Sequence, residues 1–263
     1  MNTITFVTEL FSRIDDTMIE NKIQKHPLSS FYPSEVATLA FLFAIKGVGN
    51  RAFYRWIKRD WQEYFPNLPE RTRLFRLFKR HRHLTSFFMA EPTVLGIIDS
   101  YGIELIHPVR EGRSDQQIGK KGKSNYRWIV GCKLCLVINQ FGLISAWDCD
   151  TANVHDTVFQ HLIKELQEHM IIFADQHFHA KEGDPDNLKI CQRGRWNQRM
   201  LIETVFSMLT LVCHFKKVMH RKWDYFKMRL AFTIAAFNVL AQWDGLNPDE
   251  CGFIPLSIAE FNL

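Results

Sequence analysis

The chain contains 263 residues, enough for one large domain or two of ordinary size. Hydrophobic residues make up 46% of it and charged residues 23%, which excludes an intrinsically disordered chain, a collagen-like chain and a disulfide scaffold. No apolar run reaches the roughly 20 residues that a bilayer span needs, and no signal peptide is visible at the N-terminus. We therefore expect a soluble cytoplasmic protein with no membrane partner.

The net charge of +5 is unevenly distributed along the chain. Residues 1–90 contain 14 Lys and Arg against 8 Asp and Glu, whereas residues 91–263 contain 19 against 20. A positive excess confined to one third of a protein favours a polyanionic partner for that third.

Residues 1–91 are predicted to form an all-helical domain, because apolar side chains recur at helical spacing between turn signals. Ser34 is expected to cap the second helix and Asn50 the third. The predicted helices cover residues 4–19, 34–46, 50–61 and about 70–89.

The second and third predicted helices flank a short turn, Gly-Val-Gly (47–49), which gives the outline of a helix-turn-helix. Between residues 46 and 83, 11 Lys and Arg stand against 3 Asp and Glu. Phosphate neutralisation is the simplest reason to concentrate positive charge in this way, so we expect DNA contact here. The expected contacts in this domain are Arg51, Arg55, Lys58, Arg59, Arg73 and Arg76.

The composition changes at Glu91-Pro92, and residues 92–263 are predicted to form a second, α/β domain. Short apolar runs, a hairpin turn at Asn-Gln-Phe-Gly (139–142) and two long helical patterns indicate a mixed sheet with helices packed on it. The predicted strands cover residues 94–99, 126–139, 143–147, 170–175 and 188–191, and the predicted helices cover residues 156–169, 197–217 and 223–243.

Residues 110–127 join the first two predicted strands and are rich in Gly, Ser and Lys. This composition predicts a cationic loop, which would help to hold a DNA backbone. The expected DNA contacts in this segment are Lys120, Lys121, Lys123 and Arg127.

Three acidic residues stand out as candidates for chemistry. Asp99 ends the first predicted strand and Asp175 the fourth, and those two strands can lie side by side. Glu203 lies on one polar stripe of the helix that follows the last strand. Adjacent carboxylates repel one another, so a cation such as Mg²⁺ or Mn²⁺, which prefers oxygen ligands, would stabilise them.

Histidine and cysteine residues suggest two other metal sites. His177 and His179 follow Asp175 closely, and alternating strand spacing would place all three on one face as a rival His/Asp hydrolase site. Cys132 and Cys135 form a CxxC, but residues three apart on a strand face opposite sides, so zinc is not expected. The six cysteines, at positions 132, 135, 149, 191, 213 and 251, are expected to be free thiols.

Six short strings, in this order, resemble the RNase H-like core of DDE transposases, and in particular an IS982/IS4-like insertion-sequence family. They cover roughly residues 94–210, and the basic helical third is also similar to the N-terminal region of that family. The strings are Ile-Ile-Asp-Ser (97–100), Gly-Lys-Lys-Gly-Lys-Ser (119–124), Arg-Trp-Ile-Val-Gly-Cys-Lys-Leu (127–134), Asn-Val-His-Asp (153–156), Ala-Asp (174–175) and Arg-Met-Leu-Ile-Glu-Thr-Val-Phe-Ser (199–207).

The resemblance implies an RNase H-like mixed sheet with flanking helices, preceded by an all-helical helix-turn-helix-like domain. Asp99, Asp175 and Glu203 would be the catalytic and metal-binding triad, holding two Mg²⁺ or Mn²⁺ ions. Lys133 and Arg199, the latter in an Arg-x-x-x-Glu signature, join the expected DNA contacts. The implied activity is hydrolysis at the ends of an insertion sequence followed by strand transfer. The implied partner is double-stranded DNA, as terminal inverted repeats and as target, and a homodimer would pair the two ends.

The sequence departs from this family at three points. Trp196 and Thr210 stand where related transposases have Tyr and Lys, and only 28 positions separate Asp175 from Glu203. Two alternatives therefore stay open: an RNase H-like metal-dependent nuclease without strand transfer, and a catalytically inactive DNA-binding remnant.

Overall fold

The computed structural model describes residues 2–124, 127–191, 199–214, 220–247, 250 and 256. Its N-terminal part is all helical, which confirms the four predicted helices. The fourth is shorter than predicted and ends in a 3-10 helix, η1. The bounds are α1 Thr3–Glu20, α2 Pro33–Lys46, α3 Asn50–Asp60, α4 Arg71–Arg80 and η1 Arg82–Phe88.

The predicted helix caps are wrong by one or two positions. Helix α2 starts at Pro33, whose fixed φ suits the first helical position, so Ser34 lies inside the first turn and is buried. The Glu35 carboxylate accepts a hydrogen bond of 2.7 Å from the N–H of Tyr32, the residue that precedes the helix. Helix α3 likewise begins at Asn50 itself, after Gly49.

Helices α2 and α3 are bent by 119° at the turn between them, where Gly47 adopts a positive φ of 65°. Helix α2 is buried along nearly its whole length, whereas α3 buries Phe53 and Ile57 and exposes its cations. No single helix among the described residues is long and apolar enough to cross a membrane; α2 and α3 together have the length and composition, but they meet at this bend. A DNA-reading role for this pair stays a prediction.

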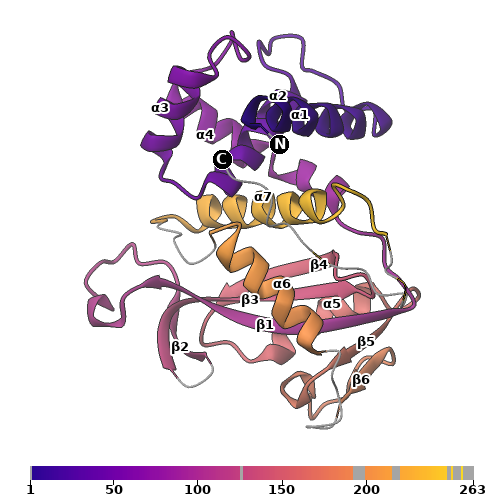
Figure 1. Ribbon diagram of the computed structural model, residues 1–263. Coiled ribbons are helices and arrows are strands. Elements are labelled where there is room, and N and C mark those ends of the chain that lie inside the picture. Colours follow the sequence, from indigo (N-terminus) through magenta and orange to yellow (C-terminus); the bar gives the residue numbers. More distant parts are fainter. Residues whose placement is uncertain are drawn as a thin grey trace.

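The second part of the chain contains a six-stranded mixed sheet. Strand β1 pairs antiparallel with β3 and parallel with β5, and β5 pairs parallel with β6. Strands β2 and β4 both pair with β3, along different stretches of it. This mixed sheet with flanking helices is compatible with an RNase H-like core (Figure 1). The bounds are β1 Leu95–Ile106, β2 Lys120–Ser124, β3 Arg127–Asn139, β4 Ile144–Thr151, β5 Ile171–Ala174 and β6 Leu188–Ile190.

Two predictions about the strands are wrong. Asp99 does not end its strand: β1 continues to Ile106, because pairing with β3 carries it beyond the apolar run. Part of the predicted cationic loop is strand β2, in which Gly122 lies so close to the Ala152 carbonyl that a Cβ would come within 1.9 Å of its oxygen. The β1 extension carries apolar side chains at alternate positions, Tyr101, Ile103 and Leu105, and pairs with β3, whereas β2 has no apolar run and depends on that pairing alone.

Helices cover both faces of the sheet (Figure 1). The predicted helix 156–169 is the short 3-10 helix η3 followed by α5; the helix predicted for 197–217 is seen as α6, and its residues 197–198 and 215–217 lie outside the described residues. Cys132 packs in the core that includes α6 and α7, and Cys135 in the core that includes α5, which confirms that they face opposite sides. The bounds are η3 Asp156–Phe159, α5 Gln160–Glu165, α6 Arg199–Leu211 and α7 Trp223–Ala241.

Helix α7 lies between the N-terminal helices and the sheet (Figure 1). Its fully buried Asn238 bonds the N–H and the carbonyl of Ile144 in β4, each at 2.8 Å, and the carbonyl of Phe88 in η1 at 2.9 Å. One hydrophobic core is continuous from α1 through α7 to the sheet. The division into residues 1–91 and 92–263 therefore stays a prediction.

Candidate active site

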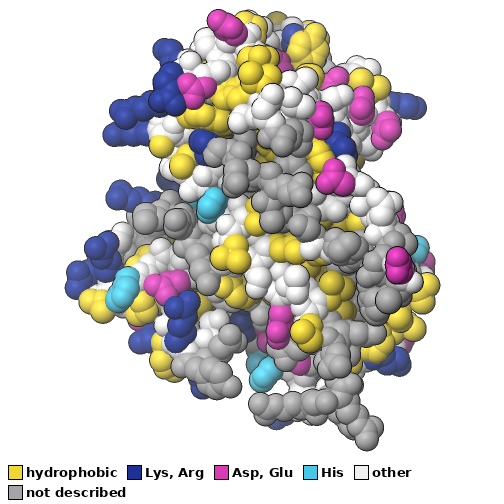
Figure 2. All heavy atoms as spheres, viewed as in Figure 1, with side chains coloured by type: hydrophobic (Ala, Val, Ile, Leu, Met, Phe, Trp, Pro, Cys, Tyr) yellow, Lys and Arg dark blue, Asp and Glu magenta, His cyan; other side chains and the backbone are white. Residues whose placement is uncertain are grey.

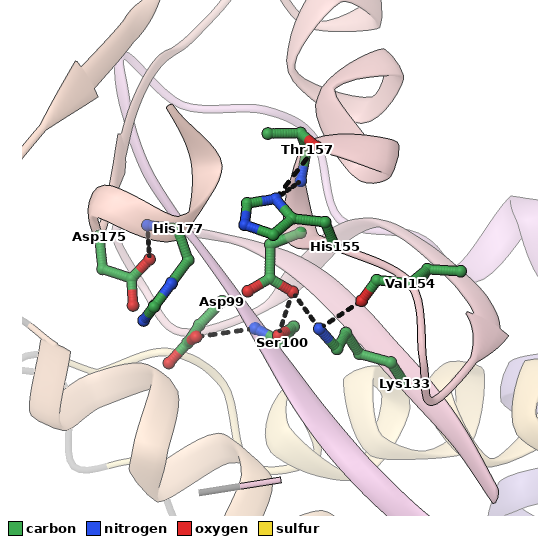
Figure 3. A network of polar contacts seen from close by, with 9 residues as sticks. Asp99, Ser100, Lys133, Val154, His155, Thr157, Asp175 and His177 are labelled. Carbon is green, nitrogen blue, oxygen red and sulfur yellow. Dashed lines mark hydrogen bonds and ion pairs between the residues drawn. The ribbon is translucent and has the colours of Figure 1, made fainter. Parts of the chain in front are cut away.

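Asp99 and Asp175 occupy matched positions on neighbouring parallel strands. Ile97 of β1 is paired with Phe173 of β5, and the same register continued by two residues sets Asp99 level with Asp175. Because side chains alternate along a strand, these two carboxylates share the face of Ile97 and Phe173. Both residues are half-buried, and their side chains extend into the same region (Figure 3). This confirms the prediction that the two acid-bearing strands lie side by side.

Local hydrogen bonds hold both carboxylates. Asp99 Oδ1 accepts a bond of 2.7 Å from the N–H of Ser100, and Asp175 Oδ1 accepts one of 2.9 Å from the N–H of His177 (Figure 3). The second bond caps the 3-10 turn η4, Gln176–Phe178, which starts directly after β5. Asp175 therefore lies at a strand end as predicted, where the chain turns away from the sheet.

Helix α6 carries Glu203 on the same side of the sheet as Asp99. Tyr101, two residues beyond Asp99 on β1, stacks on Phe206 of α6 with ring centroids 5.2 Å apart. Ile202 is fully buried, whereas Glu203 is exposed, as its polar stripe predicted. The backbone of Arg199 starts this helix, but its side chain lies outside the described residues.

Carboxylate oxygens are the donors that Mg²⁺ and Mn²⁺ prefer, so Asp99 and Asp175 fit a hard divalent cation in both chemistry and register. However, no three or more His, Cys, Asp or Glu side chains among the described residues are gathered so as to hold a metal ion. The structure therefore brings the two aspartates to one place, while Glu203, on the exposed face of α6, does not complete a metal-sized group with them.

On the opposite face of the sheet, Asp156 forms a network that sequence reasoning missed. Its Oδ1 accepts a bond of 2.7 Å from the Ser100 hydroxyl and lies 3.0 Å from the Lys133 ammonium, which also donates to the Val154 carbonyl at 2.8 Å (Figure 3). The side chains of Lys133 and Asp156 are only 16% and 13% exposed. Through its bond to the Ser100 hydroxyl, this ion pair holds the residue that follows Asp99, on the face of the sheet opposite the two carboxylates.

His155 caps η3 by accepting from the N–H of Thr157 at 3.4 Å. The sequence around His155 does not predict the ion pair of its neighbour Asp156, because Lys133 comes from the distant strand β3. The DNA contact expected of Lys133 stays a prediction, although its ammonium is already bonded to the Val154 carbonyl and paired with Asp156.

The Cys135 thiol lies beneath this network and is fully buried. Burial raises its pKa well above the ordinary value, and the carboxylates of Asp156 and Asp99 raise it further. We therefore expect a protonated, chemically inert thiol next to the site.

The rival His/Asp arrangement on a strand face is wrong, because β5 ends at Ala174 and the histidines lie in and after the η4 turn. His177 stays near Asp175 through its backbone N–H, with its ring 6.4 Å from that of His155. His179 instead pairs with Asp184 at 2.7 Å.

Exposed cations gather over α3 and again over the segment that leads into β2 (Figure 2). Some have acidic neighbours: Arg59 pairs with the adjacent Asp60, Lys121 with Glu111 at 3.6 Å, and Arg127 with Glu104 at 3.9 Å. The remaining predicted contacts with described side chains on these two surfaces are also exposed, namely Arg51, Arg55, Lys58, Arg73, Arg76, Lys120 and Lys123.

Residues 89–184 match a family model described as Transposase DDE domain. The match includes Asp99 and Asp175, ends before Glu203, and supports a DDE transposase, an enzyme class that acts on DNA as a nuclease and transferase and generally uses divalent metals. No curated protein sequence matches the chain. The narrower IS982/IS4-like family stays a prediction.

Proposed function

We propose that this protein is a transposase that hydrolyses phosphodiester bonds at the ends of an insertion sequence and joins the freed ends to target DNA. The observation that carries the proposal is the matched register of Asp99 and Asp175 on β1 and β5, inside the segment that matches the transposase DDE domain. Two carboxylates fixed on a rigid sheet form a preorganised site for phosphoryl transfer.

Asp99 and Asp175 would hold two Mg²⁺ or Mn²⁺ ions, with Glu203 as the third protein ligand. Such ions, when bound, activate a water or hydroxyl nucleophile and stabilise the leaving oxygen of a phosphodiester. The Ser100 N–H bond orients Asp99, and the Tyr101–Phe206 stack holds α6 against the sheet. Glu203 lies one turn before Phe206 on α6, so this stack also sets the place of Glu203 relative to Asp99.

The exposed cations supply the DNA contacts in this proposal. Those on α3 and α4 would bind the terminal inverted repeats, and those on β2 and at the start of β3 would hold the backbone near the carboxylates. Joining two ends to one target requires two DNA ends in one complex, which a homodimer would provide.

A strand-transfer assay on paired DNA ends with Mg²⁺ or Mn²⁺ tests the proposal. A transposase gives joined product, a nuclease gives cleaved ends alone, and a DNA-binding remnant gives neither. Asp99→Asn should abolish both products. Asp150→Asn is the matched control, because Asp150 is also half-buried on a strand and its Oδ1 accepts from the next residue, the Thr151 N–H, at 2.6 Å. Full activity of Asp99→Asn would refute the assignment of the site.

A further inference from the structure

A groove of about 770 Å³ lies between the N-terminal helices and the start of α7, away from the carboxylates. Cationic side chains from three separate parts of the chain line it, and no Asp or Glu is among its described lining residues. The titratable and charged lining groups are Arg51 from α3, Arg71 from α4, and His220, Arg221, Lys222, Tyr225 and Arg229 from the α7 region.

Arg229 is the most unusual of these residues, because it is only 4% exposed and pairs with no carboxylate among the described residues. Its guanidinium lies 4.6 Å above the Phe43 ring, and Nη1 donates to the Val48 carbonyl at 3.3 Å. Nη2 is buried and has no hydrogen-bond partner in the described structure. A buried guanidinium with an unused donor is costly unless an anion binds beside it.

His220 gives a second unsatisfied group in the same groove. Its Nε2 is buried and likewise has no hydrogen-bond partner among the described residues. Burial, reinforced by the charge of Arg229, lowers the pKa of His220 to about 4. The ring is therefore neutral at pH 7, and an anion bound beside it would favour its protonated form.

Three helices begin at this groove: α3 after Gly49, α4 after Glu70 and α7 after Lys222. None of these three preceding residues caps its helix with a side-chain hydrogen bond. Helix N-termini favour anions through their unpaired N–H groups and their dipoles. The nearby carboxylate of Asp224 is neutralised by Lys79 at 2.7 Å, so it does not oppose an anion here.

We propose that this groove is a binding site for a phosphodiester group of the DNA backbone, with Arg229 and His220 as its buried donors. The unsatisfied donors and the three helix starts are the evidence for an anion site. The choice of DNA as the molecule that supplies the anion rests on the proposed function. The groove would fix the register of the duplex on the helical part of the protein, at a distance from the carboxylates.

Binding of a fluorescein-labelled DNA duplex, followed by anisotropy over a range of salt concentrations, tests the proposal. Arg71→Gln and Lys222→Gln remove one groove cation each, and Lys164→Gln, which removes an exposed lysine of α5, is the matched control. Each groove variant should bind about fivefold more weakly at 0.15 M salt and lower the salt slope by about 1, while the control should not. Slopes equal to that of the wild type would overturn the proposal.

The His220 ring gives a direct readout by ¹⁵N NMR at pH 6, with the duplex and with inorganic phosphate as probes. A bound phosphodiester should shift the neutral ring toward its protonated form. If inorganic phosphate shifts the His220 ring and the duplex does not, the assignment of the site to DNA is wrong. If neither probe shifts the ring, the groove is not an anion site.

The proposed function can fail independently of this groove. Duplex binding measured without a divalent cation reports on the groove, which Arg71 and Lys222 line, and cleavage reports on the carboxylates, which do not line it. If Asp99→Asn cleaves DNA normally while the groove variants lose affinity, the catalytic proposal fails and the phosphodiester site stands.

Discussion

The two faces of the sheet at β1 use carboxylates in opposite ways. Ser100, on the α5 face, bonds to Asp156, whose charge is matched by the Lys133 ammonium 3.0 Å away within a mostly buried pair. Asp99, one residue earlier, faces the α6 side, level with Asp175 across a parallel strand pair. A buried ion pair stabilises the fold, whereas the level placement of two carboxylates on one face is the arrangement that we propose for binding a divalent cation.

The largest expected effect is on DNA cleavage. Replacing Asp99 or Asp175 with Asn keeps the size of the side chain but removes its charge, so cation binding at the site is lost. Cleavage should fall by about a thousandfold or more, comparable to removing a principal electrostatic group from an active site. Single-turnover cleavage of a labelled duplex measures it, with Asp150→Asn as the control. The urea midpoints of unfolding of the Asp99→Asn and Asp175→Asn proteins should differ little from that of the wild type.

The next largest effect is on stability, on the other face. Asp156→Ala leaves the mostly buried Lys133 ammonium without its counter-charge, which should lower the free energy of unfolding by about 3 kcal/mol. Urea denaturation followed by circular dichroism measures it.

The double variant Lys133→Met, Asp156→Leu controls for this loss. With both charges removed, stability should return to within about 1 kcal/mol of the wild type. A double variant as unstable as Asp156→Ala would show that the ion pair is not the reason for the loss.

A smaller effect is expected where α6 meets β1. Phe206→Leu removes the stack on Tyr101 while keeping an apolar contact, which should cost about 1 kcal/mol of stability. Because Glu203 is held through this contact, cleavage should fall about tenfold, as expected for a displaced catalytic group. If cleavage falls only as much as the fraction of unfolded protein rises, the stack does not position Glu203.

The smallest effect concerns Cys135, under the Asp156 network. Its buried thiol has a raised pKa, so it should not react with a thiol reagent at pH 8 in the folded protein. Mass spectrometry of the labelled cysteines, with and without denaturant, measures this, and rapid labelling of native Cys135 would contradict the packing of that face.

The sequence predicts the elements that carry their own local signals. The apolar run before Asp175 ends where β5 ends, and the helical stripes of α1 and α7 recur within one or two residues in the structure. The pairing of β1 with β5 also agrees with the predicted strand order.

What the sequence does not predict depends on contacts between distant segments. Strand β2 has no apolar run, and its glycine is required by the carbonyl of Ala152, which lies 30 positions further along. The sequence near Asp156 indicates only the start of a helix, because the partner of its carboxylate, Lys133, lies on the distant strand β3. The basic groove likewise needs three helix starts from separate parts of the chain.

The proposed catalysis requires that Asp99 and Asp175 together bind a divalent cation. Titration of Mn²⁺ followed by electron paramagnetic resonance tests it directly, on the wild type and on Asp99→Asn, Asp175→Asn and Asp150→Asn. We expect saturable Mn²⁺ binding by the wild type and by Asp150→Asn, and at least about tenfold weaker binding by the other two variants. Equal Mn²⁺ affinity in all four proteins would contradict it.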